Sequence, residues 1–313
     1  MGLLVDGIWK TDHGKWASKD GKFRRSASQF RHSIGSDTFP AEATRYHLYV
    51  CLACPWAHRT LIFRQLKGLE NIIPVTAVHP HMLENGWEFK PEPESLYGFR
   101  YHHQLYTRAD PHYSGRVTVP VLWDKKRETI VNNESAEIIR MFNSAFNDLT
   151  GNTDDYYPEP LRDEIDAINA FVYDNVNNGV YKCGFATRQE AYEKAFDALF
   201  AALDELEARL ANQRYLVGNR ITEADWRLFT TLIRFDAVYY SHFKCNRNCI
   251  CDMPNLWGYL RDLYQQPGIA ETVNMEHIKQ HYYYSHESVN PTRIVPRGPD
   301  LDFTAAHGRE TLA

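Results

Sequence analysis

The sequence has no stretch of about 18 consecutive apolar residues, the length that a helix needs to span a membrane. A short apolar stretch near the N-terminus is interrupted by Asp6, and no small-residue cleavage site of a secretory signal follows it. We therefore expect a cytoplasmic protein that has no membrane partner.

Runs of one charge sign are also absent. The formal net charge is −5, and acidic and basic residues are interspersed along the whole chain. Nucleic-acid-binding domains usually carry lysine and arginine clustered on one face or along one helix. Because the sequence has no such cluster, we do not expect nucleic acid as a partner.

The chain is long enough, at 313 residues, to form two modest domains with separate cores. It is rich in tyrosine, with 19 residues, and it has six cysteines: Cys51, Cys54, Cys183, Cys245, Cys249 and Cys251. Cytosolic thiols are kept reduced, so these cysteines need not form a disulfide framework. Each cysteine has to be interpreted from its local sequence.

The first half of the chain has the pattern of a thioredoxin-like domain. Its expected elements are a strand at 45–50, a helix from 54 to 66, a strand at 72–78, strands at 117–123 and 129–131, and a helix at 134–146. The helix between the first two strands makes them a parallel βαβ unit, and the next two strands form a hairpin.

The second half is nearly all helical, so the fold class is an α/β thioredoxin-like domain followed by an all-α domain. We expect helices at about 161–178, 189–211, 223–242 and 254–265, the third of them opened by a capping box between Thr222 and Asp225. The domains are an extended arm at 1–40, the thioredoxin-like domain at 41–147 with an insertion at 79–115, the helical domain at 160–284 and a tail at 285–313. An insertion of this length, without a sustained period, is usually functional.

The strongest chemical signal is the motif Cys54-Pro55-Trp56-Ala57, which follows the first expected strand and opens a helix. Proline suits the first helical position because the amide hydrogen that it lacks would be unpaired there. Cys54 then lies at the helix N-terminus, where free N–H groups and the helix dipole favour a thiolate, the reactive form of cysteine. A buried structural cysteine that caps a turn is the alternative interpretation.

Cys51 and Cys54 together form Cys-x-x-Cys, a spacing typical of dithiol redox sites. In thioredoxin-like sites the partner of the reactive cysteine lies one turn further into the helix, where this chain has Ala57. We therefore predict a single-thiol mechanism, with a packing role for Cys51.

One group of possible metal ligands occurs late in the chain: His242, Cys245, Cys249 and Cys251. The Cys-x3-Cys-x-Cys spacing fits none of the usual paired zinc knuckles. We therefore expect no metal, and we assign no histidine a catalytic role.

Several motifs occur together, in chain order Cys54-Pro55-Trp56-Ala57-His58-Arg59, Asn85-Gly86-Trp87, Val119-Pro120, Asn133-Glu134-Ser135, Tyr181 in Asn-Gly-Val-Tyr-Lys, and a C-terminal Pro-Gly-Ile-Ala-Glu-Thr-Val. From about residue 30 to 310 the chain resembles the xi-class glutathione transferases, which are S-glutathionyl-hydroquinone reductases. Cys-Pro-Trp alone would also suit omega-class enzymes, whereas the insertion and the later motifs are more specific.

The resemblance implies glutathione as a co-substrate and gives binding roles to five residues: Trp87, Arg116, Val119, Glu134 and Ser135. The Val119–Pro120 peptide is expected to be cis, with the Val119 backbone pairing with the cysteinyl part of glutathione. Ser135 and nearby N–H groups suit the γ-glutamyl carboxylate, and Glu134 suits its ammonium group. Trp87 and Arg116 would close over the glycine end.

The resemblance also implies that Tyr181, Tyr239 and Tyr282 converge on an electrophile pocket above Cys54. A phenol there can donate a hydrogen bond to a quinol oxygen. The implied reaction is reduction of a glutathionylated aromatic substrate through a Cys54–glutathione mixed disulfide, by an enzyme that is expected to be a homodimer. The alternatives are an omega-like thioltransferase or dehydroascorbate reductase, and a non-catalytic binding scaffold of the same fold.

Overall fold

The computed structural model of the protein describes residues 2–11, 20–23 and 25–312. The described residues form two compact units. The first contains residues 2–11, 25–154 and 272–281, and the second contains residues 20–23, 155–271 and 282–312. None of the helices in these described ranges is both long and apolar enough to cross a bilayer.

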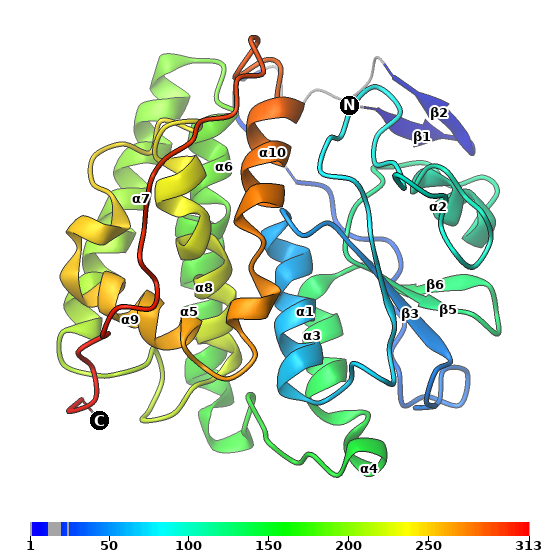
Figure 1. Cartoon of the computed structure of the whole chain (residues 1–313), viewed down its shortest axis with the longest axis horizontal. Coiled ribbons are helices and arrows are strands. Elements are labelled where there is room, and N and C mark those ends of the chain that lie inside the picture. The colour runs from blue at the N-terminus through cyan, green and yellow to red at the C-terminus, as the bar shows by residue number, and fades with distance from the viewer. Residues whose placement is uncertain (1, 12–19, 24, 313) are drawn as a thin grey trace. The chain divides into compact units, whose positions relative to one another are not determined.

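The first unit is built on a four-stranded sheet (Figure 1). Its strands are β3 (Tyr46–Val50), β4 (Val75–Ala77), β5 (Val121–Asp124) and β6 (Thr129–Asn132), in the spatial order β4-β3-β5-β6. β3 and β4 are parallel, whereas β5 runs antiparallel to both β3 and β6. This mixed sheet confirms the predicted thioredoxin-like topology.

Two helices accompany the sheet, and they lie side by side in Figure 1: α1 (Pro55–Leu66) and α3 (Ser135–Ser144). α1 begins at a proline, as the sequence predicted, and the chain leaves it through Gly68, whose φ of 64° favours glycine. All five residues of β3 and all four of β5 are buried. The start of α1 is therefore held by a rigid core, which fixes the residue that precedes Pro55.

The boundaries of two strands differ from the prediction. β5 starts at Val121 rather than at residue 117, because Pro120 has no amide hydrogen to donate to a neighbouring strand. β4 covers only Val75–Ala77, since Pro74 interrupts the run that was predicted from residue 72 in the same way. The order and direction of the elements are unaffected.

The insertion at 79–115 is not all loop, because it contains α2 (His103–Ala109). The helix has seven residues, of which Leu105 and Tyr106 are buried, so it is too short to give a helical period in the sequence. A short helix α4 (Asn147–Thr150), which was not predicted, follows α3 and ends at Gly151.

The N-terminal arm contains regular structure that was not predicted, although residues 1, 12–19 and 24 lie outside the described residues. β1 (Leu3–Val5) and β2 (Ile8–Lys10) form a hairpin. Further along, the segment 30–32 lies against the free side of β6: His32 N donates to Val131 O at 3.0 Å, and Asn133 N donates to Phe30 O at 3.1 Å. The arm thus extends the sheet of the first unit.

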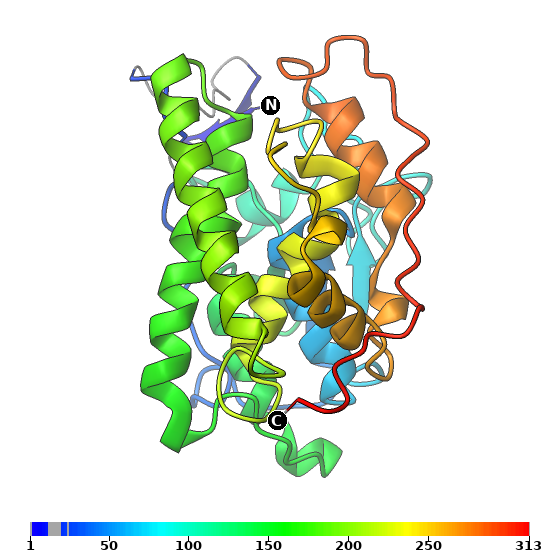
Figure 2. The same ribbon diagram turned by 90° about the vertical axis from the view of Figure 1, so that its left-hand side faces the viewer.

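The second unit is helical, and its helices lie alongside one another in Figure 2. Its main helices are α5 (Arg162–Val172), α6 (Gly179–Gly184), α7 (Gln189–Leu210), α8 (Glu223–Arg234) and α9 (Pro254–Tyr264). Shorter turns are η1 (Glu159–Leu161), η4 (Ile250–Asp252) and η5 (Ala270–Thr272). The predicted helices at 161–178 and 223–242 each change into a π-helical turn, η2 (Tyr173–Asn177) and η3 (Phe235–Tyr239).

The last helix, α10 (Met275–Ser285), was not predicted. Residues 272–281 group with the first unit because they form hydrogen bonds there. His281 Nδ1 lies 2.8 Å from Pro80 O, and Gln280 Oε1 lies 3.0 Å from His81 Nε2. Residues 282–285 of the same helix belong to the second unit.

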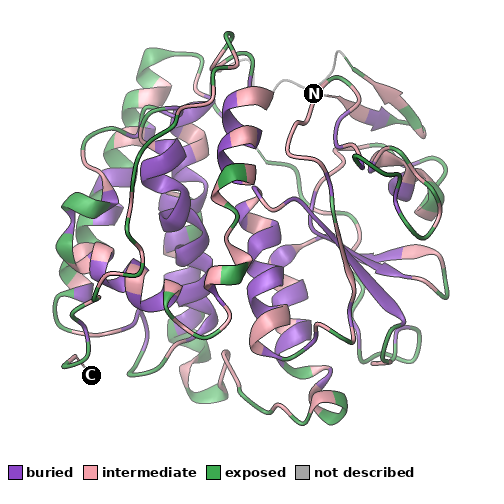
Figure 3. Ribbon diagram, viewed as in Figure 1, coloured by how far each residue is buried: buried purple, intermediate pink, exposed green. Residues whose placement is uncertain are grey.

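Helix α8 is the centre of the second unit, since all twelve of its residues are buried (Figure 3). The capping box predicted at its start is present. Asp225 accepts hydrogen bonds from Thr222 N at 2.7 Å, from Leu216 N at 2.9 Å and from Tyr259 OH at 2.8 Å. The buried carboxylate of Asp225 thus connects α8 to α9 and to the loop that precedes α8.

We expect Asp225→Ala to lower the free energy of unfolding by about 3 kcal/mol, because it removes a cap and leaves several buried donors unpaired. Denaturant unfolding measured by tryptophan fluorescence would test this. Asp163→Ala is the matched control, because Asp163 is an exposed acid in the first turn of α5. The Asp163→Ala substitution should lower the free energy of unfolding by about 0.5 kcal/mol or less. Equal losses in the two variants would contradict the role assigned to Asp225.

The C-terminal segment after α10 has no helix or strand among residues 286–312, and it packs along the second unit. Gln265 Nε2 donates to Phe303 O at 2.9 Å, and Arg309 Nη2 donates to Gln213 O at 2.6 Å. The space beside Gly258 is filled by His307 O, which a Cβ at position 258 would approach to 2.8 Å. The predicted tail therefore has a defined path, held by hydrogen bonds to the second unit.

Candidate active site

Cys54 is the N-cap residue of α1, with φ −75° and ψ 121°, and its side chain forms no capping hydrogen bond. Its amide donates to Cys51 O at 3.0 Å, and its carbonyl accepts the first helical bond, from His58 N at 2.9 Å. The residue is neither sealed in the core nor fully exposed. The thiol is thus held at the positive end of a twelve-residue helix, in the position that the sequence predicted.

The Val119–Pro120 peptide is cis, as expected from the resemblance. Val119 O lies 3.7 Å from the Sγ of Cys54. The structure therefore brings the predicted nucleophile and one predicted glutathione-binding residue together within the first unit.

Cys51 is fully buried, and its Sγ lies 3.6 Å from Nε2 of His277, at the start of α10. All six cysteines are free thiols. A buried thiol that packs against an imidazole agrees with a packing role for Cys51. The contact with His277 could not be predicted, because the two residues are 226 positions apart.

Glu134 and Ser135 lie at the N-terminus of α3, the helix that packs beside α1. Glu134 is the N-cap residue: its Oε1 accepts from Ala136 N at 3.2 Å, and its Oε2 accepts from Ser28 Oγ at 3.2 Å. Ser135 is 3% exposed, and its Oγ has no hydrogen-bond partner among the described residues. A buried hydroxyl without a partner at a helix N-terminus is suited to an anionic ligand.

Trp87 and Arg116 are also in the first unit. The Trp87 ring is mostly buried, and its centroid lies 4.9 Å from that of His281. Arg116 is half-buried, and burial, followed by the nearby Arg25, lowers the pKa of its guanidinium. Two cations close together favour an anion between or beside them.

One aromatic and cationic group next to Cys54 was not predicted from the sequence. The guanidinium carbons of Arg25 and Arg59 lie 4.6 Å and 4.5 Å from the centre of the Trp56 ring. Trp56 is part of the recognised motif, but the pattern gave no sign that Arg25, in the N-terminal arm, reaches it. This group adds positive charge near the start of α1.

Tyr181, Tyr239 and Tyr282 lie together in the second unit. Tyr282 OH is 2.6 Å from Tyr181 OH and 2.9 Å from Tyr239 OH, so the three phenols form a hydrogen-bonded chain. Tyr239 and Tyr282 are fully buried, whereas Tyr181 is half-buried. Burial raises the pKa of Tyr239 and Tyr282 well above the usual value, so both remain protonated donors. That this chain and Cys54 act on one substrate stays a prediction.

The possible metal ligands of the sequence do not form one cluster. His242 Nε2 lies 3.2 Å from His286 Nδ1, and Cys245 is buried beside Cys183. Cys249 and Cys251 instead lie beside Asp236 of η3. Burial, followed by the carboxylate, raises the pKa of both thiols, that of Cys251 to about 12.

Comparison with known proteins agrees with these features. The family model for the glutathione S-transferase N-terminal domain matches residues 53–145, and that for the C-terminal domain matches residues 189–262. The chain is 56% identical to the glutathionyl-hydroquinone reductase YqjG of Escherichia coli, over 99% of both chains. It is 54% identical to the glutathionyl-hydroquinone reductase PcpF of Sphingobium chlorophenolicum, over 96% of both chains.

Solved structures give the same result. The xi-class glutathione transferase of Natrialba magadii superposes with a TM-score of 0.95 at 52% identity, over 100% of this chain and 98% of that one. The glutathione-bound structure of Escherichia coli YqjG gives a TM-score of 0.89 at 55% identity, over 99% of both chains.

The chain is a glutathione transferase. It has a thioredoxin-like unit followed by a helical unit, and a cysteine lies at the start of the first helix of the thioredoxin-like unit. Within that superfamily, the chain belongs to the xi class, together with the glutathionyl-hydroquinone reductases.

Proposed function

We propose that the protein reduces S-glutathionyl-hydroquinones to hydroquinones at the expense of glutathione, with Cys54 as the nucleophile. The observation that carries this proposal is the position of Cys54 at the N-terminus of α1, with its Sγ 3.7 Å from Val119 O. The helix terminus favours the thiolate over the thiol, and the thiolate is the species that attacks sulfur.

In the first step, the Cys54 thiolate attacks the sulfur of the glutathionyl group. The carbon–sulfur bond breaks, its electron pair goes to the ring carbon, and a proton added there gives the free hydroquinone. Cys54 is left in a mixed disulfide with glutathione. The leaving group is a carbon, so the step is harder than disulfide exchange, and reaction through the keto tautomer of the quinol makes it feasible.

In the second step, the thiolate of a second glutathione attacks the glutathione sulfur of the mixed disulfide. Oxidised glutathione leaves and the Cys54 thiolate is restored. The two electrons taken up by the aromatic ring therefore come from two glutathione sulfurs, which become one disulfide. A cysteine at this position bonds to glutathione, which disfavours simple conjugation as the main activity.

Glutathione is held, in this proposal, by the residues at the start of α3 and by Val119. The Ser135 hydroxyl and the first amides of α3 bind the γ-glutamyl carboxylate, and Glu134 binds the ammonium group next to it. The Val119 backbone pairs with the cysteinyl part, which places its sulfur near Cys54. Arg116 and Trp87 bind the glycine end.

We expect Ser135→Ala to raise KM for glutathione about tenfold, because it removes a hydrogen bond to a carboxylate worth about 1.4 kcal/mol. The turnover number should change little, since the contact is the same throughout the reaction. Ser144→Ala, at the exposed C-terminal end of the same helix, is the matched control and should leave KM unchanged. A KM for Ser135→Ala equal to that of the control would exclude this hydroxyl from the glutathione site.

The tyrosine chain supplies hydrogen bonds to the quinol part of the substrate. Tyr181 is the accessible member, so we assign its hydroxyl to the quinol oxygen. Tyr239 and Tyr282 are buried positioning residues that orient that hydroxyl through the Tyr181–Tyr282 and Tyr239–Tyr282 hydrogen bonds. Each remains protonated, so the chain can stabilise negative charge on the oxygen without losing a proton.

The direct test is mass spectrometry of the protein after incubation with a glutathionyl-hydroquinone and no free glutathione. A glutathione adduct on Cys54, together with released hydroquinone, is expected. An unmodified Cys54 in the presence of released product would exclude the mixed-disulfide mechanism.

A second candidate function is thioltransferase activity, because the chain is also 53% identical to a Schizosaccharomyces pombe protein named glutathione S-transferase omega-like 2. The two functions need the same thiol, but only the reductase needs a quinol site. Comparing kcat/KM for a glutathionyl-hydroquinone with that for a glutathione mixed disulfide separates them, and the first should be larger.

We extend the proposal to the assembly, for which the resemblance is the support, and to the location. The protein acts as a homodimer in the cytoplasm, on a quinone-derived substrate. Light scattering coupled to size-exclusion chromatography gives the mass in solution, and the mass of one chain, 36.4 kDa, would exclude the dimer.

A further inference from the structure

We propose that Asp236, Cys249 and Cys251 form a zinc-binding site in the second unit, with a water molecule as the fourth ligand. The carboxylate oxygen and the two Sγ atoms all lie within 4.8 Å of one another. In a tetrahedral zinc site the Zn–S distance is about 2.3 Å and the Zn–O distance about 2.0 Å, so ligand atoms lie about 3.5 to 4 Å apart. One ion can therefore reach all three with only small side-chain adjustments.

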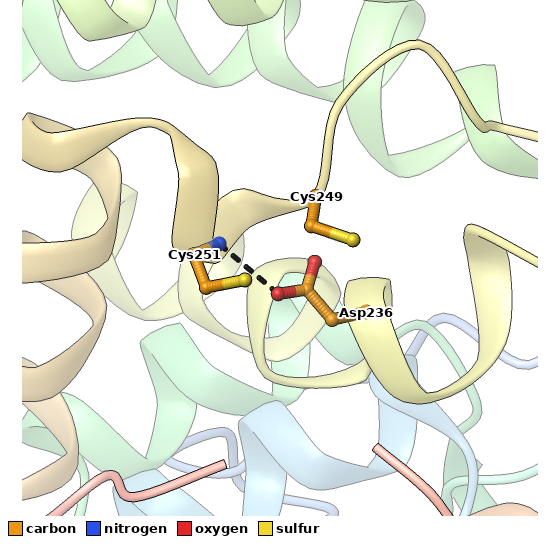
Figure 4. Close-up of side chains that lie close together, drawn as sticks. All are labelled: Asp236, Cys249 and Cys251. Carbon is orange, nitrogen blue, oxygen red and sulfur yellow. Dashed lines mark hydrogen bonds between the residues drawn. The ribbon is translucent and has the colours of Figure 1, made fainter. Parts of the chain in front are cut away.

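Backbone hydrogen bonds hold the carboxylate in place. Asp236 Oδ1 accepts from Ile250 N at 2.6 Å. Oδ2 accepts from Cys251 N at 3.0 Å, the bond drawn as a dashed line in Figure 4. The side chain of Cys251 also hydrogen-bonds to this carboxylate, and loss of the thiol proton on metal binding would free that lone pair for the ion. Carboxylates that bind metal ions are commonly oriented by such second hydrogen bonds.

Two separate turns supply the ligands. Asp236 comes from the π-helical turn η3, Cys249 is the N-cap of η4, and Cys251 is inside η4. Asp252 Oδ2 accepts from Cys249 N at 3.2 Å, which fixes the first cysteine of the turn. In Figure 4 both sulfur atoms lie next to the carboxylate of Asp236.

The charges also favour a cation. Asp236 is 8% exposed, and among the described residues no lysine, arginine or histidine forms an ion pair with it. A buried carboxylate is normally paired or bound to a metal ion. A divalent ion with two thiolates would supply this pairing, and the exposed side of Cys251 leaves room for a water ligand.

The ligand types select the ion. Calcium and magnesium prefer all-oxygen sites, so two sulfurs exclude them. Cu(I) prefers soft sulfur ligands such as thiolates, and a carboxylate is a poor ligand for it. Zinc accepts cysteine and aspartate together and needs four ligands, which two sulfurs, one oxygen and water provide.

Sequence spacing could not reveal this site. The expectation of no metal was based on the Cys-x3-Cys-x-Cys spacing, in a group that also held His242 and Cys245, and the structure places those two residues elsewhere. The third ligand is Asp236, which lies 14 positions before Ile250 and has no metal-ligand spacing to the cysteines.

The test uses the full-length reduced protein, freed of metal with a chelator and titrated with Zn²⁺ against a chromophoric chelator. Co²⁺ serves as a spectroscopic probe, because its thiolate charge-transfer absorption grows with the number of bound sulfurs. Cys251→Ser and Cys249→Ser should each weaken zinc binding at least about 100-fold, since loss of even an outer-shell partner costs about 10- to 100-fold. Each should also halve the Co²⁺ charge-transfer absorption.

Two controls locate the ion. Cys54→Ser removes the reactive thiol, and Cys183→Ser removes a buried thiol of the same unit; both should bind zinc as the unchanged protein does. Zinc should raise Tm of the unchanged protein and not that of Cys251→Ser, whose side chain is exposed and whose replacement should leave the fold intact. Equal zinc affinity in Cys249→Ser, Cys251→Ser and the unchanged protein would overturn the proposal, and so would loss of binding in Cys54→Ser.

Discussion

Replacing Cys54 with serine is expected to lower kcat/KM for a glutathionyl-hydroquinone by roughly three orders of magnitude or more. A serine hydroxyl does not ionise near neutral pH and cannot form the mixed disulfide. Both steps need the sulfur of Cys54, as the nucleophile in the first and as the leaving group in the second, so neither can occur. The fold should be retained, because the Cys54 side chain makes no capping hydrogen bond and Pro55 still opens α1. Steady-state kinetics with glutathione in excess gives the comparison.

Cys51→Ala is the matched control, because it removes the neighbouring buried thiol. Its activity should stay within a few-fold of that of the unchanged protein if the mechanism uses one thiol. Alkylation provides a second measurement: iodoacetamide should modify Cys54 first near neutral pH, and glutathione should slow this modification. Full activity in Cys54→Ser, or equal losses in the two variants, would rule out Cys54 as sole nucleophile.

The second large effect is expected for Tyr181→Phe, which should lower kcat for the quinol substrate about 100-fold, as loss of one preorganised donor does in other enzymes. The ring and its packing against Phe23 and Phe185 remain, so only the hydroxyl is lost. Thiol exchange with a glutathione mixed disulfide does not place charge on a quinol oxygen. Its rate should therefore change by less than about threefold.

Tyr283→Phe is the control for this prediction. Tyr283 is the next residue after Tyr282 on α10, and its hydroxyl contacts Ser241 and Ala237 instead of the tyrosine chain. Its loss should affect both substrates equally. If Tyr181→Phe also slowed both reactions equally, the hydroxyl would have a structural role and would not act on the quinol.

The parts of the fold and site that depend on neighbouring residues could be predicted from the sequence. Cys54 at the start of α1 follows from the strand, the proline and the helical period around it, which are contained in about 20 residues. The capping box of Thr222 and Asp225 is equally local. The parallel pair β3–β4 and the hairpin β5–β6 follow from the helix between the first two strands and the short turn between the other two.

The parts that depend on distant residues could not be predicted in this way. Tyr181 and Tyr282 are 101 positions apart, and no period links them, so only the family resemblance put them on one site. Asp236 is one of many acidic residues until the fold brings it to Cys249 and Cys251. Helix α2 was missed because only two of its residues are buried.

The contact of residues 30–32 with β6 has a consequence for truncation. Without that contact, β6 would be an exposed edge strand whose N–H and C=O groups are unpaired. An exposed edge strand readily pairs with the same strand of another molecule. Deleting the chain through Ser33 should therefore cause aggregation even though it leaves Cys54 and every helix of the second unit in place. The arm acts as a cover that keeps the sheet from growing beyond one molecule.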